Sequence, residues 1–232
     1  MHKLDRPAVA APTCLNNYDH RTQDWDDICQ NCKGDVRQQL SLLQGRPTSG
    51  QQIIGLRCAY CENDIYHGGH IEHFRRKNRK IGFPHLTFTW SNLFLSCDAS
   101  QHCGHYKDRP GGPAYNPDLL VKPDIDDPDK FLYFHSNGEV RPREGLSPAD
   151  HQRAEMTIEV FGLRNGGLVG ARKRAAKKYL KLVSELHEML SAEQDEGMRE
   201  YALDDLQKYC RDEITNTQWD AYATTIRHFL RR

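Results

Sequence analysis

The segment 58-CAYCENDIYHGGHIEHFRRKNRK-80 concentrates metal-binding and charged residues over a short distance. It contains a Cys-x-x-Cys pair, three histidines and the neighbouring residues Glu72 and His73, and it ends in a basic run. Thiolates, imidazoles and carboxylates are the usual protein ligands of metal ions. The segment therefore contributes either to one structural metal site or to two sites, of which one is catalytic.

A second pair of cysteines can complete a site begun by Cys58 and Cys61. Cys97 and Cys103 bracket the segment 97-CDASQHC-103. Four thiolates around Zn²⁺ form a closed tetrahedral structural site. We expect such a site to join the two ends of the intervening chain, and the alternative is a set of buried free thiols.

The bulk composition favours a cytosolic protein. The chain has 232 residues, 38% of them hydrophobic, and eight cysteines. Its first residues lack the apolar core of a signal peptide, and no apolar run approaches membrane-spanning length. In a reducing compartment closely spaced cysteines bind metals more often than they form disulfides, so we expect metal sites without a disulfide scaffold and no contact with a membrane.

The charge distribution excludes a general polycation. The formal net charge is zero, but basic residues gather at 75–80 and 172–178 and acidic ones at 124–129. Each basic run is either a solvated surface or a contact for nucleic-acid phosphates or an acidic partner.

The patterning predicts an α+β protein that is mostly helical, with three segments. Residues 1–50 form an N-terminal arm and helix, residues 51–115 form a core with the cysteines, and residues 116–232 form a loop, a β-hairpin and a helical region. The individual elements expected are an irregular arm over 1–23, a helix over about 25–43, strands over 70–74 and 86–94, a long ordered loop over 109–128, a hairpin over 131–143, helices over 147–161 and 168–190, and one or two further helices over 193–232 divided near 215–217.

Three other cysteines have weaker interpretations. Cys29 and Cys32 form a second Cys-x-x-Cys pair, but they fall in an expected helix and only Cys14 is nearby in the sequence. We therefore expect no metal there, and the role of this pair stays open. Cys210 lies on the apolar side of a late helix and is expected in the core.

The histidines and Glu72 suit phosphodiester hydrolysis. That reaction needs an activated water, and it needs a cation on the scissile phosphate and the leaving oxygen. Imidazole can accept the proton of the water, and a carboxylate is a hard ligand appropriate to Mg²⁺ or Mn²⁺.

The segments 70-HIEHF-74, 89-TWSNLF-94 and 102-HCGHYKD-108 occur in order between and around the cysteines. Together they resemble HNH endonucleases of the zinc-knuckle type, which have the ββα-metal fold. The resemblance implies that His73 is the general base and that Glu72 binds the catalytic Mg²⁺ or Mn²⁺. It also implies that Asn92 fixes the catalytic loop through side-chain hydrogen bonds.

The third motif departs from the common pattern, in which His or Asn directly follows the last cysteine. Gly104 occupies that position. We therefore assign the last ligand of the catalytic metal to His105, with His102 as the second candidate, and expect Lys107 to contact a phosphate. His70 is a possible extra ligand because it shares the strand face of Glu72.

These motifs, continued by 120-LVKPDIDDPDKFLYFHSNGEVRPREGLS-147, resemble PtuB, the HNH component of Septu-type and retron-associated anti-phage systems. The resemblance implies a cytoplasmic bacterial nuclease that acts with an ABC-type ATPase, PtuA, and in retron systems with a reverse transcriptase and its RNA and DNA. The expected substrate is DNA. Two alternatives are an RNA substrate such as tRNA, and a noncatalytic zinc module that binds partners.

Overall fold

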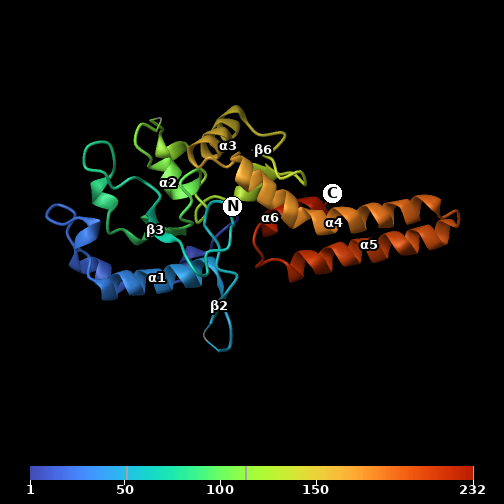
Figure 1. Ribbon diagram of the computed structural model, residues 1–232, viewed down its shortest axis with the longest axis horizontal. Coiled ribbons are helices and arrows are strands. Elements are labelled where there is room, and N and C mark those ends of the chain that lie inside the picture. Colours follow the sequence, from blue (N-terminus) through green and yellow to red (C-terminus); the bar gives the residue numbers. More distant parts are fainter. Residues whose placement is uncertain (51, 113, 232) are drawn as a thin grey trace.

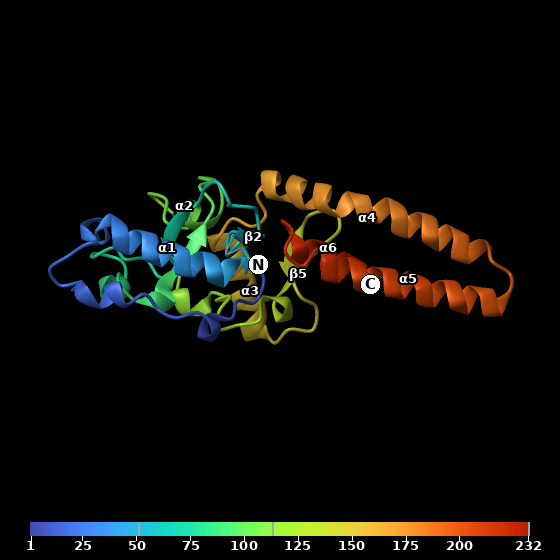
Figure 2. The same cartoon turned by 90° about the horizontal axis from the view of Figure 1, so that it is seen from below.

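The computed structural model describes residues 1–50, 52–112 and 114–231. The fold is α+β, as expected, although helices take up only about half of the chain and the sheets are small two-stranded ones. Figure 1 shows a body that contains the N-terminus, from which two long helices, α4 (Gly166–Ala192) and α5 (Glu196–Asn216), extend side by side as a hairpin. Figure 2 shows the same projection from a second direction, with the C-terminus beside the two helices.

The first long helix, α1 (Gln30–Gln44), begins later than the sequence predicts. The expected first turn is instead a separate 3₁₀ turn, η3 (Trp25–Asp27). It is closed by the backbone N–H of Asp24, which donates to Asp27 Oδ2 at 2.6 Å. Acidic side chains that bond nearby backbone groups favour such turns over a continuing helix.

The N-terminal arm is ordered against the body and holds a disulfide. Its short helices are η1 (Arg6–Ala8) and η2 (Thr13–Asn17). A disulfide joins Cys14 to Cys32 of α1, so the expectation that no cysteines pair in this way is wrong. The bond fixes η2 against α1 and closes the intervening loop that carries η3.

The two strands of the central sheet are followed by a short helix. Strand β3 (His70–His73) pairs antiparallel with β4 (Leu93–Ser96), and α2 (Cys103–Lys107) comes next. A strand beginning near residue 86 is wrong, because η4 (Pro84–Leu86) and η5 (Trp90–Asn92) occupy that region. The hydroxyl of Thr87 donates to the carbonyl of Pro84 at 2.7 Å, which supports the turn.

Helix α1 is tied to β4 through the buried side chain of Gln44. Its amide nitrogen donates to the carbonyl of Leu95 at 2.9 Å, and its oxygen accepts from the N–H of Leu95 at 2.7 Å. These bonds satisfy the free edge of β4, which a buried strand requires. After α1 the chain forms a small hairpin from β1 (Arg46–Pro47) and β2 (Ile53–Ile54).

The hairpin expected over 131–143 is confirmed. Strands β5 (Leu132–Phe134) and β6 (Val140–Pro142) pair antiparallel around Asn137-Gly138. Gly138 has a φ of 91°, a region that favours glycine. The long loop before the hairpin is also confirmed for its described residues, with only η6 (Pro117–Leu119) and η7 (Pro128–Lys130) as regular turns; residue 113 lies outside the described residues.

The C-terminal half follows the predicted helices. Ser147 caps α3 (Pro148–Val160), and α4 (Gly166–Ala192), α5 (Glu196–Asn216) and α6 (Ala223–Leu230) follow. The break between α5 and α6 begins at Thr217, where the sequence predicts it. No helix in the described ranges is both long and apolar enough to cross a membrane.

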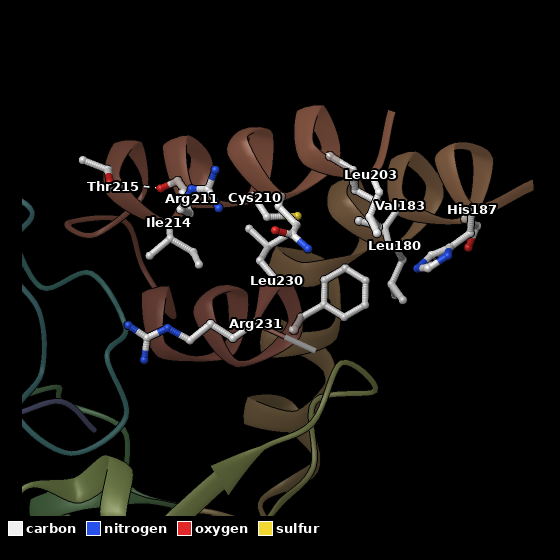
Figure 3. A pocket seen from close by; sticks show the side chains of 14 residues that line it. Leu180, Val183, His187, Leu203, Cys210, Arg211, Ile214, Thr215, Leu230 and Arg231 are labelled. Atoms are coloured by element: carbon white, nitrogen blue, oxygen red, sulfur yellow. Dashed lines mark hydrogen bonds between the residues drawn. The ribbon is translucent and has the colours of Figure 1, made fainter. Parts of the chain in front are cut away.

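Two apolar cores support these elements. The larger one draws residues from the arm, the cysteine region and the hairpin, for example Leu4, Phe94 and Leu132. The smaller one joins α4 to α6 through Tyr179, Ile226 and Leu230. Figure 3 shows the pocket that remains between α4, α5 and α6, where the half-buried Cys210 is one of the lining side chains.

Candidate metal and catalytic site

The structure brings four cysteines together in one buried cluster. The Sγ atoms of Cys58, Cys61, Cys97 and Cys103 all lie within 4.8 Å of one another. Cys58 and Cys61 lie in a turn closed by the N–H of Glu62, which donates to the carbonyl of Cys58 at 3.1 Å. The chain thus folds two distant pairs into one donor set, as the spacing predicts.

The electrostatics of this cluster favour a bound cation. Burial raises the thiol pKa of Cys61 and of Cys103, whereas hydrogen bonds from Cys103 and Cys58 hold the pKa of Cys97 far below its usual range. Several thiolates cannot share a buried site unless a positive charge compensates them. Four sulfur donors fit a soft or borderline ion such as zinc.

His102 lies beside this cluster. Its Nδ1 is 3.2 Å from the Sγ of Cys103 and 3.7 Å from the Sγ of Cys97. The structure therefore places His102, the second candidate ligand of the catalytic metal, at the cysteine site. His105 lies instead in a second polar group, with His70 and Asp98.

That second group lies where β3 faces the loop after β4. His70, Asp98 and His105 each offer a ligand atom, and these atoms lie within 4.8 Å of one another. The Nδ1 of His70 is 3.2 Å from Asp98 Oδ1, and the rings of His70 and His105 stack with centroids 4.0 Å apart. Sequence analysis did not single out Asp98, because an isolated aspartate in a loop carries no motif. Its only signal is that it directly follows Cys97.

Glu72 is buried behind His70 and is paired with Lys107. The Nζ of Lys107 lies 2.9 Å from Glu72 Oε1, and His70 Nε2 lies 3.4 Å from Oε2. Burial opposes ionisation, but the ammonium of Lys107 and the hydrogen bond from His70 lower the pKa of Glu72 to about 2. Glu72 is therefore a carboxylate held by a fixed cation.

The phosphate contact expected for Lys107 does not fit its position. The side chain has no exposed surface, and its Nζ donates to the carbonyl of His73 at 3.0 Å and to Asp108 at 2.6 Å. The ammonium group thus donates two hydrogen bonds inside the protein and forms an ion pair with Glu72. In this arrangement Lys107 positions Glu72 and the end of β3.

His73 points to different partners from those of Glu72, as alternation along a strand requires. Its Nε2 lies 3.0 Å from the carbonyl of Thr87, and its ring meets the edge of Trp25 at a centroid distance of 4.7 Å. Burial lowers the pKa of His73 to about 4. The ring is therefore neutral near pH 7, with Nε2–H donating to the carbonyl and the lone pair on Nδ1.

Asn92 bridges the two segments on either side of His73. Its side chain accepts from the N–H of Arg75 at 2.8 Å and donates to the carbonyls of Arg75 and Leu86 at 3.0 and 3.2 Å. The segment at Leu86 also carries Thr87, whose carbonyl holds His73. Asn92 thus fixes the backbone that orients the histidine.

The basic runs have mixed exposure. In the first, Arg75, Arg76 and Arg79 form ion pairs with aspartates. In the second, Arg172 is fully buried and donates to the carbonyl of Leu163 at 2.7 Å, so it belongs to the core. The remaining cations of that run are exposed on α4, and one of them, Lys178, pairs with Glu213 of α5 at 3.9 Å.

Comparison with known proteins finds two relatives, both named for defence systems. The chain is 28% identical to the Septu protein PtuB of Bacillus mycoides (strain KBAB4), over 55% of this chain and 49% of that protein. It is 25% identical to the "Retron Vc95 putative HNH endonuclease" of Vibrio cholerae serotype O1 biovar El Tor, over 65% of this chain and 68% of that protein.

The chain resembles HNH-type proteins of anti-phage defence. This confirms the resemblance seen in the motifs. The match spans about half the length of the Septu relative. No protein-family model matches the chain.

Proposed function

We propose that the chain is a metal-dependent HNH endonuclease that hydrolyses nucleic-acid phosphodiester bonds. Both relatives are named for defence systems, and one name includes HNH endonuclease. The observation that carries the proposal is the neutral His73, whose Nε2–H is held by the carbonyl of Thr87, so that the lone pair is on Nδ1. A general base must be unprotonated at the working pH, and it is most effective when its pKa lies near that pH, which exposure of the buried ring to water would bring closer.

In the proposed hydrolysis, the residues of the site have separate roles. His73 accepts the proton of the attacking water, and Asn92 keeps the backbone at Arg75 and Leu86 in place around it. A divalent ion, when bound on the polar face formed by His70, Glu72 and His105, supplies positive charge to the scissile phosphate and the leaving oxygen. The cysteine cluster holds a structural zinc that fixes the start of α2.

The partners are proposed from the resemblance of the motifs together with the defence systems that the relatives' names give. We propose that the chain acts in a bacterial defence complex, and the resemblance implies as partners an ABC-type ATPase and, in some systems, a retron reverse transcriptase and its nucleic acids. The hairpin of α4 and α5 projects from the body and is available for such contacts (Figure 1). DNA is the first substrate to test, and tRNA the second.

The second candidate function is a noncatalytic zinc scaffold. One observation favours it: His73 has only 5% of its surface exposed and lies under Trp25. A nuclease with this arrangement needs an opening of the arm before substrate reaches the base. A noncatalytic scaffold needs no such opening.

The decisive test is His73→Ala, assayed on labelled DNA and tRNA with Mg²⁺ or Mn²⁺, with and without the neighbouring ATPase. Loss of a general base lowers the cleavage rate by about 10²-fold to 10⁴-fold. Zinc content and assembly are expected to stay at wild-type levels. His151→Ala, at an exposed position on α3, is the matched control. Undiminished cleavage by His73→Ala would refute the proposal and favour the scaffold.

A further inference from the structure

Gly104, which follows the last zinc-knuckle cysteine, leaves no room for a metal ligand at its own position. A Cβ added to Gly104 would lie 2.5 Å from Glu72 Oε2, 2.7 Å from Glu72 Cδ and 3.0 Å from His70 Nε2. No side chain fits there unless Glu72 moves. The space beside Gly104 is taken by the carboxylate of Glu72 and, next to it, by the imidazole of His70, and both side chains come from β3.

Glu72 is placed to orient His70. Its Oε1 is engaged by the buried ammonium of Lys107 at 2.9 Å, and its Oε2 faces His70 Nε2 at 3.4 Å. Histidines that bind metals commonly donate their second ring N–H to a carboxylate, which fixes the tautomer and the direction of the ring. With Nε2–H directed at Glu72, the lone pair of His70 is on Nδ1.

The other ring nitrogen of His70, Nδ1, lies within hydrogen-bond distance of Asp98 and faces an accessible group of donors. Asp98 Oδ1 lies 3.2 Å from Nδ1, and the ring of His105 stacks on that of His70. A nitrogen lone pair and a carboxylate at this distance repel each other unless a proton or a cation lies between them. The side chain of Asp98 is 60% exposed, whereas that of Glu72 is 6% exposed. An ion on this side can reach both solvent and a substrate phosphate.

We propose that the divalent ion of the nuclease is bound by His70, Asp98 and His105, and that Glu72 is a positioning residue for His70 rather than a ligand. This inference rests on the proposed function for its catalytic meaning, but the binding site stands on the geometry alone. The donor atoms lie within 4.8 Å of one another, and a bound ion at about 2.1 Å from each would draw them closer together by side-chain rotation.

The donor set predicts which metal binds. Two imidazoles and one carboxylate suit first-row transition metals, whereas Mg²⁺ prefers oxygen ligands. The site therefore binds Mn²⁺ and Co²⁺ more tightly than Mg²⁺. The thiolate cluster retains its zinc during such a titration, because soft sulfur ligands do not favour Mn²⁺.

The test is a titration of the zinc-loaded full chain with Mn²⁺, followed by the electron paramagnetic resonance signal of the free ion. His70→Ala, Asp98→Ala and His105→Ala are each expected to weaken binding by more than about 100-fold, beyond the effect of losing a partner that only orients a ligand. Glu72→Gln is expected to weaken it by about 10-fold to 100-fold. Exposed residues far from the site, His151→Ala and Glu185→Ala, are the matched controls and leave binding unchanged.

Wild-type Mn²⁺ affinity in Asp98→Ala, or a larger loss in Glu72→Gln than in Asp98→Ala, would overturn the inference. Zinc content and thermal unfolding report whether each variant folds. Asp98 and His105 are exposed, so their variants keep the test decisive even if Glu72→Gln fails to fold.

The binding result is separable from the nuclease result. If Mn²⁺ binds through these residues but no substrate is cleaved, the proposed function fails and the site stands. If cleavage occurs while Asp98→Ala binds Mn²⁺ normally, the function stands and the ligand assignment fails.

Discussion

At the scale of single residues, the neighbours Glu72 and His73 show how a strand separates two roles. Their side chains leave β3 on opposite faces, so Glu72 meets Lys107 while His73 meets Thr87 and Trp25. One face stabilises a carboxylate and the other keeps an imidazole neutral. Adjacent positions thus obtain different charge states, one negative and one neutral, from different surroundings.

Removing the cover over His73 is expected to raise its pKa. The pKa is held at about 4 mainly by burial, against an ordinary value of 6.5. In Trp25→Ala water reaches the ring and stabilises the charged form, so the pKa moves up toward 6.5. Nuclear magnetic resonance titration of the histidine ring protons measures this, with His73→Gln used to assign the signal. An unchanged pKa would show that Trp25 does not shield the ring.

Loss of one cluster cysteine is expected to release the structural metal. Cys97→Ser replaces a thiolate with a poor zinc ligand, so bound zinc falls and thermal stability drops with it. Elemental analysis and thermal unfolding give the two readouts. Cys210→Ser, outside the cluster, is the matched control and keeps its zinc. Full zinc occupancy in Cys97→Ser would argue against a site of four thiolates.

At the scale of elements, the sheet β3–β4 and the helix α2 are held from both sides. Gln44 ties α1 to the edge of β4, and Ser96 Oγ accepts from the N–H of Gly104 at 3.1 Å, which anchors the start of α2. The polar group at His70 is thus built on fixed backbone. Precise placement of donors is what a metal site requires.

The contact between α6 and η7, the turn before the β5–β6 hairpin, is expected to weaken in acid. Asp129 accepts from Arg227 at 2.7 Å and pairs with His228 at 3.2 Å. Although burial opposes it, the bond from His228 and the charge of Arg227 lower the pKa of Asp129 from 3.8 to about 2. A carboxyl whose folded pKa is lowered stabilises the fold above its unfolded pKa, and this stability is lost as pH falls toward 2.

Asp129→Asn is therefore expected to lower the free energy of unfolding by about 2 kcal/mol at pH 7. Urea titrations at several pH values measure the difference, which shrinks as pH falls below 4. Asp204→Asn, an exposed position on α5, is the control and changes little. A difference that stays constant from pH 7 to pH 2 would contradict the ionic explanation.

At the scale of the whole molecule, the buried Glu62 joins the cysteine region to the C-terminal helix. It follows Cys61 in the chain, and its carboxylate accepts from the hydroxyl of Thr224 at 2.6 Å and from the N–H of Thr224 at 3.2 Å. Its carbonyl accepts from the N–H of Tyr222 at 3.1 Å. Segments far apart in the sequence therefore meet at one buried charge.

Glu62→Ala is expected to lower the free energy of unfolding by about 3 kcal/mol, because it leaves buried donors without their charged partner. Chemical denaturation measures this loss. The exposed Glu185→Ala on α4 gives the reference for a carboxylate without buried partners. Equal stability of the two variants would mean that the bonds of Glu62 to Thr224 do not contribute to holding α6.

Much of the fold was predictable because it depends on local signals. Helical spacing and a Ser-Pro start gave α3, and Asn137-Gly138 gave the β5–β6 hairpin. The strand expected over 86–94 was wrong for most of its length, because side-chain bonds to the backbone made turns there. The Cys14–Cys32 disulfide was missed, since short spacing drew attention to Cys29 instead.

The sequence by itself determined the two cysteine pairs, the position of Glu72-His73 and the absence of a ligand at Gly104, since these depend only on residue identity and order. The tertiary structure alone decided which residues meet. It set Asp98 and His105 beside His70, and it buried Lys107 against Glu72. These contacts join positions from different elements, and only the packing of β3, β4 and α2 can bring their side chains within reach.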